Sequence, residues 1–272
     1  MSIMIQFPFF STLLLFSATT ALTVLPSESG FRPETSISRR VVLATLLGTA
    51  AATPFAAQVA HAADDEAVYF GAGCFWHMQH EFIQAERDLL GRDLDTQLSA
   101  TAGYAGGTKT DGQGRVCYHN FQNVADYGRL GHGEVVGLTL PSDKIAEFGK
   151  VYFSLLDPKT KDRVDPMDRG AEYRSLLGLP GGTSHPAYPG IQEAAEAAGV
   201  TLKRGQGNDG DTLGKKLVWV YDTQTFPFYQ AEVYHQYHND FQSAPYGKAY
   251  NQMGSQAFED GRLKLTGCPD RV

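Results

Sequence analysis

The chain has 272 residues, 42% of them hydrophobic, a length that suits one large domain or two small ones. Its formal net charge of -7 argues against a nucleic-acid partner, because such partners attract basic surfaces. The three cysteines, Cys74, Cys117 and Cys268, are too few and too scattered for a disulfide framework. None forms a C-x-x-C pair, which argues against a zinc ribbon and a thioredoxin-like motif.

Residues 1–62 have the composition of a targeting presequence rather than of a folded domain. Residues 7–22 are apolar and match the length of a signal-peptide core. A twin arginine at 39–40 precedes a second apolar run ending in an A-x-A site, which predicts cleavage before Ala63. This bipartite pattern resembles the presequences of plastid proteins of the thylakoid lumen in algae with complex plastids. A single signal peptide, for the periplasm or for secretion, is the alternative, and both leave a mature domain at 63–272.

Hydrophobic periodicity and turn residues along the mature chain predict alternating strands and helices. We expect strands at 66–70, 97–104, 134–140, 172–179 and 216–221, and helices at 74–90, after an N-cap at Ser142, and at 191–198. This order predicts an α+β fold, a ferredoxin-like two-layer α/β sandwich with a β-α-β-β-α-β core. The stretch from Phe226 shows no clear periodicity, so we expect an irregular C-terminal tail that wraps around the domain.

Residues 108–130 form a long, polar insertion with glycines between two predicted strands. A loop of this length in a compact domain is usually functional or disordered. Its three aromatic residues, Tyr118, Phe121 and Tyr127, favour a functional role.

A glycine-flanked cysteine stands where the first strand meets the first helix, in Gly71-Ala72-Gly73-Cys74-Phe75-Trp76. Because a helix N-terminus favours negative charge, we expect the pKa of the Cys74 thiol to be lowered and its thiolate to be a nucleophile. Two large aromatic side chains beside it are suited to an apolar pocket. A small buried cysteine that only closes the strand–helix junction is the alternative.

Two polar segments further along the chain offer acids and hydrogen-bond donors. The sequence His132-Gly133-Glu134 has the H-x-E form of zinc deaminases, but the P-C-x-x-C that would complete the metal site is missing. We expect Glu134 to be a partly buried acid with a raised pKa that donates a proton, although an ordinary strand-edge glutamate is the alternative. Tyr173 has a phenol that can donate a hydrogen bond, or it is a core-edge tyrosine.

Five motifs in a fixed order resemble the A-type peptide methionine sulfoxide reductases (the MsrA family). They are G-C-F-W at 73–76, G-Y-A-G-G at 103–107, G-H-G-E-V-V at 131–136, D-x-G-x-x-Y-R-S at 168–175 and F-Y-x-A-E…H-Q at 228–236. The resemblance covers residues 68–241, nearly all of the mature domain. It implies an enzyme that reduces methionine-S-sulfoxide, free or in proteins, to methionine, and that thereby repairs proteins after oxidative stress.

The resemblance also implies a role for each matching residue. Cys74 would be the nucleophile, which attacks the sulfoxide sulfur and becomes a sulfenic acid. Glu134 would protonate the sulfoxide oxygen. Phe75, Trp76 and Tyr104 would bind the substrate, the first two around its methyl group.

Three further residues of the implied site are polar. Asp168 and Tyr173 match the aspartate and the oxygen-binding tyrosine of the family's D-x-G-x-x-Y segment. A second oxygen-binding tyrosine precedes the G-H-x-E segment in the family. It falls on Tyr118, or else on Tyr127, because the insertion makes this part of the match insecure.

The sulfenic acid must be resolved by another thiol, through an intramolecular disulfide. We expect Cys268, near the C-terminus, to be the resolving cysteine, with Cys117 as its competitor. A two-step relay through paired tail cysteines is not expected, because the tail holds one cysteine. The family implies no bound cofactor and an external, thioredoxin-like reductant. The expected partners are oxidised proteins, peptides and free methionine sulfoxide, without nucleic acid or membrane, and the mature protein is expected to be a monomer.

Three residues depart from the family's usual pattern. His77 follows G-C-F-W where glycine is common, Gly133 stands where alanine is usual, and Glu172 replaces the usual glutamine. We expect these departures to change access or substrate preference. Two other functions stay open on the sequence: a cysteine peptidase or acyltransferase with a histidine base, and a non-catalytic module that binds a methionine-containing peptide.

Overall fold

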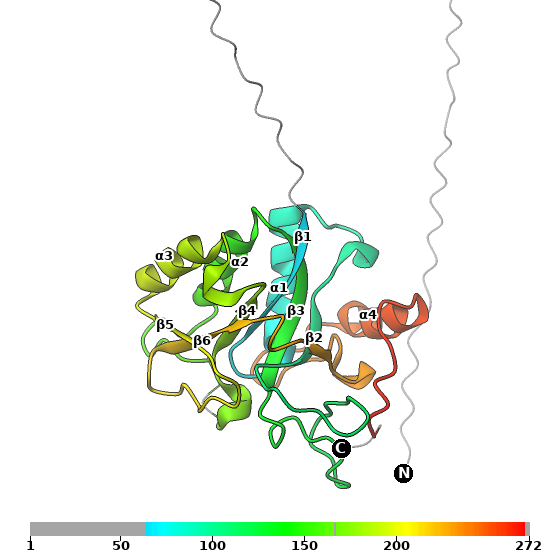
Figure 1. Cartoon of the computed structure of the whole chain (residues 1–272). Helices are drawn as coiled ribbons and strands as arrows, with labels where there is room; N and C mark the ends of the chain where they lie inside the picture. The colour runs from blue at the N-terminus through cyan, green and yellow to red at the C-terminus, as the bar shows by residue number, and fades with distance from the viewer. Residues whose placement is uncertain (1–63, 166, 270–272) are drawn as a thin grey trace, which may run out of the picture. The chain divides into compact units, whose positions relative to one another are not determined.

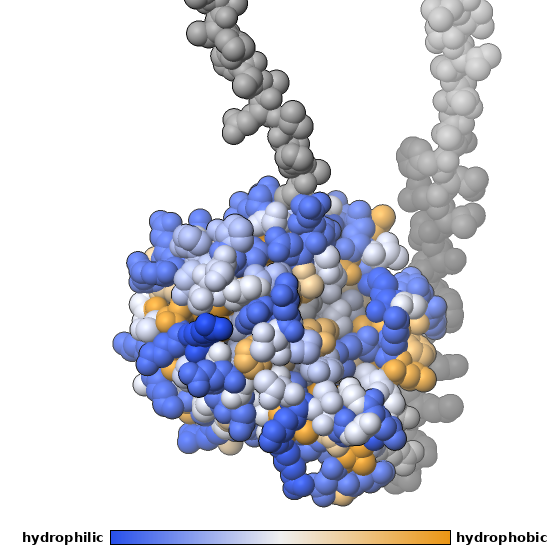
Figure 2. Space-filling model, viewed as in Figure 1, coloured by the Kyte–Doolittle hydropathy of each residue, from blue (hydrophilic) through white to orange (hydrophobic). Residues whose placement is uncertain are grey.

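The computed structural model describes residues 64–165 and 167–269, so the predicted presequence at 1–62 lies outside the described residues. Within the described part, no helix has both the length and the apolar character needed to cross a membrane. Figure 2 shows polar residues over most of the visible face, with apolar residues in small scattered groups. Scattered apolar side chains of this kind are normal on a protein surface.

The described residues form a mixed α+β fold of seven strands in one sheet and four α-helices, so the predicted class is confirmed (Figure 1). The strands are β1 Asp65–Gly71, β2 Thr101–Ala105, β3 Gly133–Pro141, β4 Leu176–Leu179, β5 Thr201–Arg204, β6 Leu217–Asp222 and β7 Tyr229–Gln230. The helices are α1 Phe75–Leu90, α2 Ile145–Ser154, α3 Tyr188–Ala198 and α4 Lys248–Glu259.

The sheet has the strand order β5-β6-β4-β1-β3-β2-β7, with β1 at its centre. Strand β1 pairs antiparallel with β3 and β4, whereas β6 pairs parallel with β4 and β5. At the end of β1, a Cβ on Gly71 would lie 2.1 Å from the carbonyl oxygen of Glu134, so a side chain has no room there. This close approach brings the turn after β1 next to the first residues of β3.

Helix α1 lies across the central strands of the sheet (Figure 1). Its buried face includes Phe75, Met78, Phe82 and Ile83, at the spacing that the sequence predicts. Gly91 ends the helix in the left-handed conformation at φ 63°, which glycine adopts without steric cost. The N-terminus of α1 is therefore held at the edge of the core where β1 and β3 meet.

Several predicted boundaries are wrong for local reasons. Helix α2 is capped by Lys144 rather than by Ser142. The strand expected at 172–179 begins only at Leu176, because Ala171–Tyr173 forms a single 3-10 turn. The strand expected from residue 97 begins at Thr101, after another such turn.

The C-terminal part is more regular than the sequence suggests. Residues 248–259 form α4, where we expect an irregular tail, and β5 is also absent from the prediction. The buried residues of α4 are Tyr250, Met253, Gly254 and Ala257, which have helical spacing. Two of the four are small, so the apolar stripe is weak in the sequence.

Candidate active site

The turn between β1 and α1 places Cys74 at the N-cap of the helix. Gly73 precedes it with φ +76°, and a Cβ there would lie 2.7 Å from the Oδ2 atom of Asp168. The N–H of Cys74 donates to the same Oδ2 over 2.8 Å, and the N–H of Gly73 donates to the carbonyl of Tyr173 over 3.1 Å. The glycine thus lets the loop that carries Asp168 and Tyr173 lie directly against the cysteine.

Glu134, near the start of β3, is buried beside this turn, with 2% of its surface exposed. Its Oε2 accepts the N–H of Phe75 over 3.0 Å, and its Oε1 accepts the hydroxyl of Tyr127 over 3.0 Å. Burial raises the pKa of Glu134 to about 8, against the lowering effect of these two hydrogen bonds. The carboxyl is therefore mostly protonated at neutral pH, as expected for a proton donor.

The thiol of Cys74 does not behave as the sequence predicts. Burial raises its pKa well above the usual value, and the charge of Glu134 raises it further. The N–H groups of Trp76 and His77 at the helix N-terminus act in the opposite direction but are outweighed. The expected resting thiolate is wrong: without substrate, Cys74 is a neutral thiol.

A cavity of about 70 Å³ opens over the sulfur of Cys74. Of the nine residues predicted for the site, seven line this cavity, namely Cys74, Phe75, Trp76, Tyr118, Glu134, Asp168 and Tyr173. They come from the start of α1, the insertion, β3 and the loop before β4, so the fold gathers residues that are far apart in the sequence. Tyr104 and Cys268 do not line it.

Aromatic rings form one wall of the cavity. Phe75 stacks on Tyr118 with ring centroids 6.4 Å apart, and Tyr118 stacks on Tyr127 at 5.7 Å. The side chains of Tyr118 and Tyr127 both interact with Tyr173. Burial raises the pKa of all three phenols, so they stay protonated; Tyr118 and Tyr173, which line the cavity, can donate hydrogen bonds to an oxygen atom there, whereas Tyr127 donates to Glu134.

Tyr104 lies behind this aromatic wall and is fully buried. Its hydroxyl donates to Oε2 of Glu232 over 2.8 Å, and Oε1 of Glu232 accepts the N–H of Tyr118 over 2.9 Å. Tyr104 therefore supports Tyr118 through Glu232. Sequence reasoning missed Glu232, although it belongs to the last of the five motifs.

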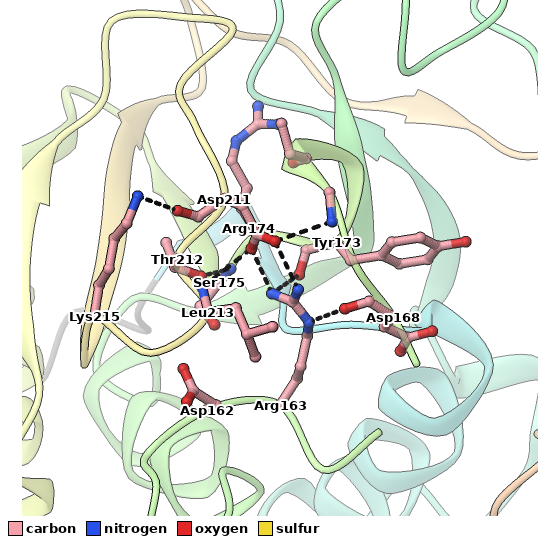
Figure 3. Close-up of polar contacts among 12 residues, drawn as sticks. Asp162, Arg163, Asp168, Tyr173, Arg174, Ser175, Asp211, Thr212, Leu213 and Lys215 are labelled. Carbon is pink, nitrogen blue, oxygen red and sulfur yellow. Dashed lines mark hydrogen bonds and ion pairs between the residues drawn. The ribbon is translucent and has the colours of Figure 1, made fainter. Parts of the chain in front are cut away.

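Asp168 and Tyr173 are held by a buried arginine that sequence reasoning also missed. Arg163 is 4% exposed and lies between Asp168 and Asp211, as Figure 3 shows. Its Nη1 donates to the carbonyl of Tyr173 over 3.1 Å and to Asp211 over 2.8 Å, and its Nε donates to the carbonyl of Asp168. Although burial acts to raise the pKa of Asp211, its hydrogen bonds with Arg163 lower it to about 2.

Asp168 itself sits in a less polar setting than Asp211. Burial raises the pKa of Asp168 to about 6, against the effect of the hydrogen bond from the N–H of Cys74. The carboxylate of Asp165 adds to this rise. The role that the structure gives Asp168 is to fix the turn that carries Cys74.

The two other cysteines are bonded to each other. Cys117 in the insertion and Cys268 near the C-terminus form a disulfide with Cα atoms 5.6 Å apart, which leaves Cys74 as the free thiol of the described chain. The sequence predicts Cys74 as the partner of Cys268. In the structure Cys268 is instead paired with Cys117, which lies 151 positions away in the sequence.

The disulfide lies beside a second cavity of about 290 Å³, lined among others by Cys268, Glu232 and His235. Tyr118 lines this cavity as well as the first one. Within the described ranges, Cys117, Glu232 and Cys268 are the group whose donor atoms lie close enough to share a metal ion, and the disulfide occupies both sulfurs.

His132, of the H-x-E segment, has a structural role. Its Nδ1 accepts the N–H of Gly107 over 3.3 Å, and its Nε2 lies 2.7 Å from the carbonyl oxygen of Lys109. Burial lowers its pKa to about 4, so the ring is neutral and binds two main-chain groups. Neither nitrogen is left to bind a metal.

A half-buried thiol, a protonated carboxyl and tyrosine hydroxyls around one small cavity define a cysteine-dependent redox site. Residues 66–264 match the model of a known family, described as peptide methionine sulfoxide reductase. The chain belongs to the peptide methionine sulfoxide reductase family, as its five motifs predict, and is an oxidoreductase of the MsrA type.

The sequences of two MsrA proteins agree with this assignment. The peptide methionine sulfoxide reductase MsrA of Natronomonas pharaonis is 32% identical over 188 residues, which are 68% of this chain and 86% of that protein. The MsrA of Trichodesmium erythraeum is 28% identical over 184 residues, which are 66% and 85% of the two chains. Reduced Mxr1 from Saccharomyces cerevisiae is a similar solved structure, with 21% identity, a TM-score of 0.42 and coverage of 64% of this chain and 83% of its own.

Proposed function

We propose that the protein reduces methionine-S-sulfoxide, free or in proteins, to methionine through a sulfenic acid on Cys74, and so repairs oxidised proteins. The observation that carries this proposal is the single cavity that holds both Cys74 and the protonated carboxyl of Glu134. Family membership supports the reaction, and the geometry supports the role of each residue.

In the first step, the sulfoxide oxygen accepts hydrogen bonds from Glu134 and from the hydroxyls of Tyr118 and Tyr173. The methyl group of the substrate packs against Phe75 and Trp76, which line the same cavity. These donors stabilise the charge that develops on the oxygen as the sulfoxide bond breaks.

Glu134 both gives and receives a proton in this step. The sulfur of Cys74 attacks the sulfoxide sulfur while Glu134 gives its proton to the oxygen. The thiol proton of Cys74 then returns to the Glu134 carboxylate. The OH group then passes from the substrate sulfur to the sulfur of Cys74 as the S–O bond and the new S–S bond break. Methionine leaves, Cys74 becomes a sulfenic acid, and the thiol has supplied both electrons.

We propose that Cys268 resolves this sulfenic acid and that Cys117 completes the exchange. The thiol of Cys268 displaces water from the sulfenic acid to form a Cys74–Cys268 disulfide. Cys117 then attacks the sulfur of Cys268, which releases Cys74 as a thiol. The Cys117–Cys268 disulfide is the product that this second exchange leaves, and the reverse order would leave the same disulfide, so the order is decided by the mapping experiment below. An external dithiol, thioredoxin-like by family, reduces this pair.

One assay tests the reaction. Wild type and Cys74→Ser are given the S and R epimers of methionine sulfoxide with dithiothreitol as reductant. We expect turnover of the S epimer by wild type only. Absence of that turnover in folded wild type contradicts the proposal, and acyl-enzyme formation with an ester would favour the peptidase or acyltransferase.

A second experiment tests the order of the disulfides. After one turnover of Cys117→Ser, peptide mapping by mass spectrometry should find Cys74 linked to Cys268. A wild-type enzyme trapped early with Cys74 linked to Cys117 would contradict the assignment of Cys268 as the resolving cysteine.

Three further points belong to the proposal. The strand order β4-β1-β3-β2 supports a ferredoxin-like core for the sheet.

The bipartite presequence at 1–62 supports delivery to the thylakoid lumen, and a mature protein that retains residues 39–40 would contradict it. We also propose a monomer, which light scattering on the mature chain would test.

A further inference from the structure

The mouth of the catalytic cavity lies between two loops. Residues 239–243, which we call the strap, supply Asp240, Phe241 and Gln242 to one side of the lining. Val164 and Asp165, from the loop before β4, supply the other side. The strap follows the last of the five motifs, and no role has been assigned to it so far.

Two polar contacts hold the strap in place. On one side, Nδ1 of His77 lies 3.3 Å from Oδ2 of Asp240. On the other, Nε2 of Gln242 donates to Oδ2 of Asp165 over 3.0 Å. The second contact joins the two loops directly across the mouth of the cavity. His77 is one of the three residues that depart from the usual family pattern, so the contact between His77 and Asp240 is a feature of the present chain.

The strap also has an internal frame. The carboxylate of Asp240 accepts the N–H of Ser243 over 2.7 Å and the hydroxyl of Tyr246 over 2.6 Å. The ring of Phe241 lies edge-on to Trp76, with centroids 5.3 Å apart, while 83% of Phe241 stays exposed. The backbone turn, in which the N–H of Gln242 also donates to Asp240 over 3.1 Å, is thus built without the side chain of Gln242. Among the described residues, that side chain bridges the strap to the opposite loop.

We propose that the strap selects among methionine sulfoxides by how much polypeptide continues on both sides of the reacting side chain. A sulfoxide within a chain must carry main chain past the cavity in two directions, and the bridge from Gln242 to Asp165 spans this rim. A small sulfoxide carries no such chain and enters without breaking the bridge. The strap therefore favours small and chain-terminal sulfoxides over internal ones, and this inference rests on the proposed function.

The test compares two substrates on the same enzyme. One is N-acetyl-methionine-S-sulfoxide amide, and the other is a peptide with methionine-S-sulfoxide at its centre. For each variant, the ratio of kcat/KM on the peptide to kcat/KM on the small amide is measured at saturating dithiothreitol. Because a ratio is used, an equal loss of active enzyme cancels.

Gln242→Ala should raise this ratio about fivefold, the effect of removing one exposed hydrogen bond that the internal substrate must break. Gln242→Glu should raise it further, because it places a second carboxylate against Asp165. Gln224→Ala, at an exposed glutamine after β6, is the matched control and should leave the ratio unchanged.

The outcomes separate the strap from the reaction itself. An unchanged or lowered ratio in both Gln242 variants, with normal turnover of the small amide, overturns the role of the strap and leaves the proposed function intact. No turnover of the small amide by wild type overturns the proposed function, and the inference with it.

Discussion

The two ends of α1 are each held by a buried glutamate, and the two carboxyls have opposite surroundings. At the N-terminal end, Glu134 accepts one main-chain N–H, from Phe75, and one tyrosine hydroxyl. At the other end, the fully buried Glu86 forms an ion pair with Arg92. It also accepts the N–H and the hydroxyl of Ser99, over 2.9 Å and 2.6 Å, and the N–H of Ala100 over 3.0 Å.

This difference shows how one residue type serves two purposes along a single helix. A buried carboxylate with a cation and several N–H donors has its charge compensated and acts as a structural tie. The carboxyl of Glu134 has two donors, and burial dominates its titration. The first arrangement fastens α1 to the segment that leads into β2, and the second supplies a proton to the cavity over Cys74.

The largest expected effect is on the reaction, in Glu134→Gln. Since the amide cannot donate an acidic proton to the sulfoxide oxygen, single-turnover formation of methionine should slow by about 10²- to 10⁴-fold. Urea denaturation at about pH 4, where Glu134 is protonated in the folded chain and mostly so in the unfolded one, should show a change in unfolding free energy of less than about 1 kcal/mol, because the amide keeps an oxygen for Phe75. A rate close to that of wild type would remove Glu134 from the mechanism.

The corresponding variant at the other end of α1 is Glu86→Ala, which should lower the unfolding free energy rather than the reaction rate. It leaves Arg92 and three other donors without their acceptor, so we expect a loss of about 3 kcal/mol in unfolding free energy. The remaining folded protein should reduce the sulfoxide at the wild-type rate in a single turnover at low temperature. A slow rate in fully folded protein would mean that this end of α1 also controls the site.

The pH dependence should report on the buried carboxyl of Glu134. The folded chain holds the Glu134 proton up to a pKa of about 8, compared with an ordinary value of 4.5, so between these values the unfolded chain binds fewer protons. Wild type should therefore lose unfolding free energy relative to Glu134→Gln as the pH rises through this window, by at most about 1.4 kcal/mol per unit. The single-turnover rate of wild type should fall above pH 8, and a flat rate there would contradict this titration.

The sequence predicts those parts of the site that rest on local pattern. The glycine turn before Cys74, the strand that begins near Glu134 and the loop with Tyr173 are each visible as short motifs, and the structure gathers them around one cavity. The predicted lowering of the Cys74 pKa is wrong, because a helix N-terminus is visible in a sequence whereas the depth of burial, which raises the pKa, is not.

Long-range partners could not be predicted in the same way. Arg163 meets Asp211 across 48 positions, and Cys117 meets Cys268 across 151, with no local signal in either case. Asp211 lies in a Gly- and Asp-rich loop, where one acid cannot be distinguished from its neighbours. The stripe of α4 is a different case, because its helical spacing is present in the sequence but two of its four buried residues are small.

The smallest expected effect concerns Gly133, which directly precedes Glu134 and stands where alanine is usual in the family. A Cβ there would lie 2.9 Å from Cδ2 of Leu176, and 3.3 Å from both Nη1 of Arg174 and the carbonyl oxygen of Glu172. Leu176 can yield at the end of its side chain, so Gly133→Ala should cost about 1 kcal/mol of unfolding free energy. The shift at the start of β3 should leave Glu134 protonated at neutral pH. Thermal melts test the stability, and the pH profile of the single-turnover rate tests the protonation of Glu134. If the rate of Gly133→Ala no longer fell above pH 8, Gly133 would also position the acid.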